Sequence, residues 1–222
     1  MIDALIFDCD GVLVDSEILG LEESAIYLQG HGLNWTASDL VRLFTGYRDD
    51  VFAAKLTEAY RAVNHQDPPT SFFEGLVDER RKKKHLLSIV PGADAALRQV
   101  PVPLAVASSS RTEFLEAKLK RVGLWPLVAP HVYSADLVPH GKPAPDIFLF
   151  AADKLNVAPE KCVVVEDSAN GVKAGVAAGM TVWGLTAGGH CFEGHGARLE
   201  AAGATEVFSD YETMVQKIND QM

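Results

Sequence analysis

Two acidic residues follow the first apolar run of the chain. Asp8 and Asp10 flank Cys9 and are followed at once by Gly11, and residues 4–7 before them are apolar. Residues at a strand tip point into the crevice beyond the carboxyl ends of a parallel sheet, where α/β proteins bind ligands. Adjacent carboxylates repel each other unless a cation lies between them, and Mg²⁺ prefers oxygen ligands. The pair therefore predicts a Mg²⁺ site. The alternative is a polar strand end that leads into a turn.

A serine, a lysine and a second acidic pair accompany later apolar runs. Ser108 ends one run, where a hydroxyl either binds a phosphate oxygen or caps the next helix. Lys142 precedes Pro143, which stiffens the backbone and holds the lysine in place; the alternative is a solvent lysine in a turn. Glu166 and Asp167 end another run and would be costly without a cation. Together these residues supply the nucleophile, metal ligands, phosphate donor and cation that phosphoryl transfer needs.

The elements that must position these residues alternate along the chain. Short apolar runs predict strands at 4–7, 104–107, 131–133, 162–165, 181–185 and 206–208. Helical stretches lie between most of them, among them 113–122, 145–155 and 168–179. This order predicts an α/β fold, a doubly wound parallel (Rossmann-like) sheet with helices on both faces. In such a sheet the strand ends converge on one crevice.

One long segment interrupts the alternation. Between residues 16 and 87 the pattern is helical, with four helices expected at 17–29, 36–44, 49–63 and 70–85. We therefore expect a catalytic core of residues 1–15 and 88–222 and an inserted helical cap domain of residues 16–87. Two connections would join the domains, which permits a hinge and a lid.

Composition narrows the class of protein. The 222 residues carry a formal net charge of −10, which argues against nucleic acid and against an anionic membrane as partners. The three cysteines are too scattered for a disulfide framework. No secretory leader or spanning run is evident, so we expect a cytoplasmic protein. The helical insertion at the open mouth of the sheet makes a monomer the expected state. The basic run 79–85 is expected to be a solvated helix face, unless one of its side chains meets an anionic substrate.

With all four motifs in order, the chain resembles the haloacid dehalogenase superfamily. Within it, the chain is similar to phosphatases and β-phosphoglucomutases that carry a helical cap after the first core strand. The resemblance implies that Asp8 is the nucleophile, which forms an aspartyl-phosphate. It implies that Asp10 is the general acid and base, which protonates the leaving alcohol and then activates water. Lys142 would neutralise the charge of the nucleophile and of the transferring group.

The same resemblance implies three sets of binding residues. The Mg²⁺ ligands would be Asp8, the backbone carbonyl of Asp10, Asp167 and, through a water, Glu166. The phosphoryl oxygens would meet Gly11, Ser108 and Ser109. The cap loop, residues 45–49, would contact the substrate through Tyr47 and Arg48. The alternative is that Arg48 pairs with Asp49 or Asp50 at a helix start.

The implied activity is Mg²⁺-dependent hydrolysis of a small phosphorylated sugar, sugar acid or related metabolite. Asp10 argues against dehalogenation, because a halide leaving group needs no proton. A β-phosphoglucomutase-like mutase is the alternative, but Gly20 stands where that enzyme has a histidine. A phosphorylation-dependent signalling module is a remote alternative, since such modules lack an acid two residues after the acceptor. His190, Cys191 and His195 are expected in a surface loop rather than in a second metal site.

Overall fold

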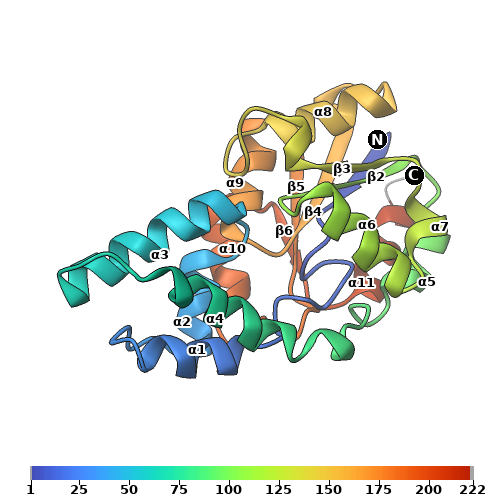
Figure 1. Ribbon diagram of the computed structural model, residues 1–222. Coiled ribbons are helices and arrows are strands. Elements are labelled where there is room, and N and C mark those ends of the chain that lie inside the picture. Colours follow the sequence, from blue (N-terminus) through green and yellow to red (C-terminus); the bar gives the residue numbers. More distant parts are fainter. Residues whose placement is uncertain (1, 221–222) are drawn as a thin grey trace.

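A parallel six-stranded sheet in the order β3-β2-β1-β4-β5-β6 forms the centre of the computed structural model, which describes residues 2–220 (Figure 1). Its strands are β1 (Ala4–Phe7), β2 (Leu104–Ser108), β3 (Val132–Ser134), β4 (Cys162–Glu166), β5 (Thr181–Leu185) and β6 (Glu206–Phe208). Every predicted strand is present, and three of them, β1, β5 and β6, have the predicted bounds. The α/β fold class is confirmed.

Side chains of successive residues in each strand enter different cores. In β1, Leu5 and Phe7 belong to one buried cluster, and Ala4 and Ile6 belong to another. This alternation is the period of a strand whose two faces are both covered.

Helices cover both of these faces. The first cluster is completed by α5 (Ala93–Gln99), α6 (Thr112–Arg121), α7 (Trp125–Val128) and α11 (Tyr211–Asp220). The second is completed by α8 (Asp146–Leu155), α9 (Ala169–Ala177) and α10 (His195–Ala202). Single-turn 3-10 helices lie at η1 (Lys84–Leu86), η2 (Ala135–Leu137) and η3 (Pro159–Lys161).

Four helices after β1 lie to one side of the sheet and have a hydrophobic cluster of their own (Figure 1). They are α1 (Leu21–Gln29), α2 (Ala37–Phe44), α3 (Asp49–Asn64) and α4 (Thr70–Arg81). Thr36 and Asp39 form a reciprocal capping box at the start of α2, so the helix begins where its N-cap signal predicts.

Two of these helices are shorter than predicted. Helix α1 begins at Leu21 rather than at residue 17, because Gly20 adopts the left-handed conformation (φ 69°) that ends the preceding turn. Helix α4 ends at Arg81, and η1 follows it instead of a continuous helix to residue 85. Helices α5, α7, α10 and α11 were not among the predicted elements.

The two connections between the helical segment and the sheet run side by side. Val14 and Ile89 form an antiparallel bridge, and the Val90 N–H donates to the Leu13 carbonyl at 3.0 Å. This pairing supports a cap of residues 16–87 on a core of residues 1–15 and 88–222, and the division itself stays a prediction. None of the helices described between residues 2 and 220 is long and apolar enough to span a bilayer.

Candidate active site

The carboxyl ends of β1, β2 and β4 bring the predicted residues together. Asp8 directly follows β1, Ser108 ends β2, and Glu166 and Asp167 lie at the end of β4. All four are buried. Because β1 pairs with both β2 and β4, residues more than 150 positions apart in the chain become neighbours.

Lys142 is the cation at the centre of this group. Its Nζ lies 2.5 Å from Asp8 Oδ1 and 2.7 Å from Glu166 Oε1, and it donates to the Ala107 carbonyl at 3.0 Å. The residue is 2% exposed, so it is not the solvent lysine of the alternative interpretation. Burial would lower its pKa, but the two carboxylates raise the pKa above its ordinary value and keep the ammonium charged.

Asp8 is exposed enough for attack and buried enough for strong electrostatics. Its side chain is 10% exposed. Burial raises the pKa of Asp8 well above its ordinary value, and the Lys142 ammonium opposes that effect. The nearby carboxylates of Glu166, Asp167 and Asp10 raise the pKa further. A site with this excess of negative charge favours a bound cation.

Asp10 is held by a different set of donors. Lys118 and Ser16 contact its Oδ1, while Ser110 donates to Oδ2 at 2.7 Å and Ser108 donates to Oδ2 at 3.4 Å. Burial would raise the pKa of Asp10, but the Lys118 ammonium and the hydroxyl donors lower it to about 2. Asp10 is therefore an anion in this structure, separate from the Lys142 pair.

Glu166 has a mainly structural set of contacts. One of its oxygens binds Lys142, and the other accepts from the backbone N–H groups of Asp167 (3.0 Å) and Ser168 (2.9 Å) and from the Ser168 hydroxyl. Both oxygens thus have protein partners. A role for Glu166 toward a metal, through a water, remains a prediction.

Asp167 is the acid that pairs with His190. Neither its Oδ2 nor His190 Nδ1 has a hydrogen-bond partner among the described residues, although His190 Nε2 lies 2.7 Å from that Oδ2 as an ion pair. A Cβ on Gly11 would overlap this carboxylate, so glycine leaves the space that Asp167 occupies. Burial raises the pKa of Asp167 to about 6, and the contact with His190 opposes the rise.

The donor set fits a magnesium ion. Asp8 and Asp167 offer buried carboxylate oxygens from neighbouring strand ends, and Mg²⁺ is normally bound by one or two carboxylates together with substrate phosphate and water. The carboxylates of Glu166, Asp167 and Asp10 all lie close enough to raise the pKa of Asp8, and a divalent cation would offset this excess of negative charge. Asp8 and Asp167 are thus the carboxylates best suited to hold it, and the role of the Asp10 carbonyl stays a prediction.

The expectation that His190 and His195 lie in a surface loop was wrong. His190 is fully buried and His195 is 5% exposed, because both pack behind Asp167 instead of lying in a surface loop. His195 Nε2 lies 2.5 Å from the Asp167 carbonyl, and its Nδ1 lies 2.7 Å from the Arg198 guanidinium. Potential ligand atoms of His190, Cys191 and His195 lie within 4.8 Å of one another. Both nitrogens of His195 have protein partners, and the absence of a second metal site stays a prediction.

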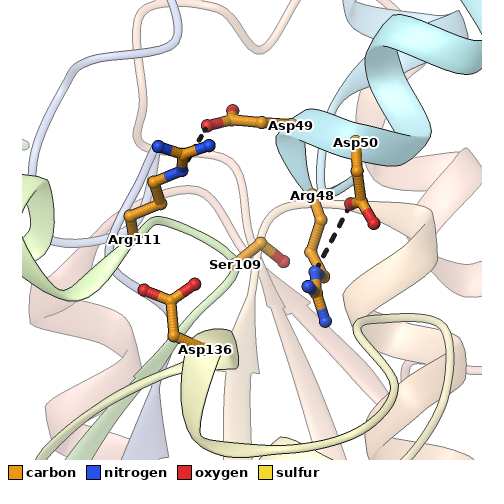
Figure 2. Close-up of a pocket in the computed structure, with 6 residues that line it drawn as sticks. All are labelled: Arg48, Asp49, Asp50, Ser109, Arg111 and Asp136. Atoms are coloured by element: carbon orange, nitrogen blue, oxygen red, sulfur yellow. Dashed lines mark ion pairs between the residues drawn. The ribbon is translucent and has the colours of Figure 1, made fainter.

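A pocket of about 360 Å³ opens between the cap loop and the core (Figure 2). It is lined by Arg48, Asp49, Asp50, Ser109, Arg111 and Asp136. Arg48 pairs with Asp50 at 3.4 Å, as the alternative interpretation of this loop expected, and Arg111 pairs with Asp49 at 3.7 Å. Two guanidinium groups thus lie at the pocket with exposed carboxylates as their partners.

The other cap residues lie as follows. Tyr47 carries the Lys55 ammonium 4.8 Å from its ring centre and is not among the residues that line the pocket. Ser109 donates to the Gly46 carbonyl at 3.1 Å, so its hydroxyl ties the cap loop to the core. In the basic run, Arg81, Lys82 and Lys83 all pair with cap acids, which agrees with a solvated helix face.

Sequence reasoning missed Lys118, Ser110 and Ser16 around Asp10. Lys118 had a usable signal, because it lies three residues after Leu115 and one before Leu119 on the buried face of α6. A lysine on such a stripe needs a partner. The two serines had no comparable signal.

Comparison with known proteins identifies the family. A sequence model described as haloacid dehalogenase-like hydrolase matches residues 2–179. The chain belongs to the haloacid dehalogenase-like hydrolases. It is similar to a phosphorylated carbohydrates phosphatase of Thermotoga maritima, with 34% identity over 204 residues that cover 90% of this chain and 91% of that protein.

Solved structures of other haloacid dehalogenase-like proteins agree over the whole length. A haloacid dehalogenase-like protein of unknown function from Agrobacterium tumefaciens has a TM-score of 0.86 at 33% identity and covers 100% of this chain and 99% of that one. A HAD family hydrolase from Deinococcus radiodurans, with bound phosphate and sodium, has a TM-score of 0.78 at 34% identity and covers 99% and 96%. This haloacid dehalogenase-like hydrolase is a phosphoric monoester hydrolase, as its phosphatase relatives indicate.

Proposed function

We propose that this hydrolase is a Mg²⁺-dependent phosphatase of small phosphorylated metabolites, sugar or sugar-acid phosphates among them, and that it works through a phosphoryl group on Asp8. The observation that carries the proposal is the pair of separate environments at the end of β1. Asp8 lies against Lys142 at 2.5 Å, whereas Asp10 is held by Lys118 and three hydroxyl groups. Two carboxylates in different environments suit two different tasks.

In the first step an Asp8 oxygen attacks phosphorus and the bond from phosphorus to the alcohol oxygen breaks. Lys142 holds the attacking carboxylate in place through Asp8 Oδ1. Because Asp10 is an anion in this structure, its carboxyl must take up a proton before this step, and it then gives that proton to the departing oxygen. The Ser108 hydroxyl, at the end of β2, would donate to a phosphoryl oxygen in this step.

In the second step water attacks the phosphoryl group on Asp8. The Asp10 carboxylate takes a proton from that water, the acyl phosphate bond breaks, and Asp8 is restored as a carboxylate. Phosphate leaves the crevice. Magnesium, when bound at Asp8, Asp167 and the Asp10 carbonyl, supplies positive charge to the phosphoryl oxygens.

The pocket and the relatives support a sugar-like substrate. Asp8, Asp10 and Lys142 do not line the pocket, so it would hold the part of the substrate that does not react. Its volume of about 360 Å³ suits a small metabolite, and Arg48 and Arg111 favour one with hydroxyls or a second anionic group. The Thermotoga maritima relative is named for phosphorylated carbohydrates. The monomeric state and the cytoplasmic location remain predictions.

Gly20 argues against the mutase alternative. A Cβ at this position would come within 2.9 Å of the Arg80 Cα, and the residue has a positive φ of 69°. A histidine cannot stand here without moving α1 from α4. In the mutase this histidine steadies the acid that matches Asp10. This chain lacks that histidine, which disfavours return of the phosphoryl group to a second sugar hydroxyl.

The test is phosphate release from a panel of sugar, sugar-acid and polyol phosphates, measured with Mg²⁺ and with EDTA. We expect Mg²⁺-dependent release from at least one class, and loss of release in Asp8→Asn with the circular dichroism spectrum unchanged. Asp153→Asn, at an exposed carboxylate on α8, is the matched control. Release that persists in Asp8→Asn, or isomerisation of glucose 1-phosphates without release, would overturn the proposal.

A further inference from the structure

Lys118 is a partly buried cation that none of the four sequence motifs contains. It lies on α6, where it projects from the helix face that also carries Leu115 and Leu119. Its side chain is 17% exposed. Its Nζ forms an ion pair with Asp10 Oδ1 and donates to Ser110 Oγ at 2.9 Å.

The contacts of Lys118 close a small network around one carboxylate. Ser110 Oγ accepts from Lys118 and donates to Asp10 Oδ2 at 2.7 Å, so both Asp10 oxygens are linked to the same ammonium. Ser16, from the first connection to the cap, donates to Oδ1 as well. Lys118 is the cation of this network among the described residues, and the other donors are neutral hydroxyls.

The network fixes the direction of the Asp10 side chain, because donors contact both of its oxygens. Hydroxyl groups orient a carboxylate, but only a cation offsets the repulsion from the Asp8 carboxylate two residues earlier. Lys142 does not serve Asp10, because its three contacts go to Asp8, Glu166 and the Ala107 carbonyl.

We propose that Lys118 is a positioning residue that holds Asp10 as an aligned carboxylate, ready to take the proton from water when the phosphoryl group on Asp8 is hydrolysed. This inference rests on the proposed function. Lys118 acts through Asp10 and does not touch the phosphoryl group. Its removal should therefore slow the second step more than attack by Asp8 on a substrate whose leaving group needs no proton.

The experiment separates the two steps with p-nitrophenyl phosphate, whose leaving group departs as the phenolate. Stopped-flow absorbance records the first turnover and the steady state for wild type, Lys118→Met and Lys118→Gln. We expect both variants to release close to one equivalent of nitrophenolate at the wild-type rate, followed by a steady-state rate at least about tenfold slower, within the range of general-base catalysis. Lys118→Arg, which keeps the charge, should restore the steady state to within a few-fold.

Lys120→Met is the matched control on the same helix. Lys120 is exposed, pairs with Glu116 at 2.6 Å and lies over the Trp125 ring. Both phases should keep the wild-type rates in this variant. Thermal unfolding of every variant shows that the fold is retained.

Two results would overturn the inference. Equal slowing of the first turnover and the steady state would mean that Lys118 binds the phosphoryl group or only supports the fold, and unchanged rates would mean that Asp10 does not need it. Wild-type protein that releases nothing from any phosphate ester would overturn the proposed function as well. An active wild type with variants that match it would overturn this inference alone.

Discussion

Lys142 is the cation that Asp8 and Glu166 share, and its burial makes it costly to replace. Lys142→Met would leave two buried carboxylates without their partner, which costs about 3–5 kcal/mol of unfolding free energy. Turnover should fall at least about 100-fold, because the attacking carboxylate loses the group that orients it. Urea unfolding and phosphate release measure the two effects.

The control for this substitution is Lys154→Met on α8. Lys154 pairs with Asp153 at 3.4 Å and is half-exposed, so the free energy of unfolding should change by no more than about 0.5 kcal/mol. Turnover of Lys142→Met within twofold of wild type would contradict the role given to Lys142.

At the scale of elements, the cap loop docks on the first turn of α9. Asn170 Nδ2 donates to the Thr45 carbonyl at 2.9 Å, and a Cβ on Gly46 would overlap the Ser168 hydroxyl. Gly46→Ala should push the loop away from the core and lower kcat/KM about tenfold, equivalent to about 1.4 kcal/mol. Steady-state kinetics on the best substrate of the panel measure it.

Gly179→Ala separates this contact from backbone strain. Gly179 has a φ of +74°, close to the +84° of Gly46, but no atom lies within 4 Å of a Cβ placed on it. Both variants carry the cost of a side chain in the left-handed region, about 1–2 kcal/mol of stability. If Gly179→Ala lowers kcat/KM as much as Gly46→Ala, the effect comes from strain and the docking contact is irrelevant.

The elements that carry the motifs were predictable because their signals are local. Apolar runs of four to five residues mark β1, β2, β4 and β5, and the motif residues lie at their ends. Helices α5, α7, α10 and α11 were missed, among them the short α7 of four residues. The burial of His190 and His195 was misjudged because it depends on Asp167, more than 20 positions away, and glycines such as Gly194 suggest exposure locally.

The site itself was predictable in its residues but not in its pairing. In the sequence, Asp8, Asp10, Lys142 and Asp167 lie at the end of a strand or in the loop that follows a strand. The parallel sheet then brings these strand ends to the same edge. Glu166 binds Lys142 with one oxygen and the start of α9 with the other. These two contacts depend on packing and have no local sequence signal. The cation that pairs with Asp10 is Lys118, which lies 108 residues away in the sequence.

At the scale of the whole molecule, the site concentrates negative charge in a chain that already carries −10. Mg²⁺ should therefore stabilise the folded state, and at 100 times its Kd the gain is about 2.7 kcal/mol. Thermal unfolding with MgCl₂, against NaCl at equal ionic strength, measures the shift. Asp167→Asn should lose it; a shift that persists in this variant would contradict the metal site.

The central claim is that phosphate passes through Asp8, and acid quench of the first turnover tests it most directly. Enzyme mixed with its substrate and Mg²⁺ is quenched within one turnover, digested and mapped by mass spectrometry. The account predicts a phosphoryl group on the peptide that contains Asp8, absent in Asp8→Asn. Phosphate release with no phosphorylated peptide at any quench time, or with the group on another residue, would contradict it.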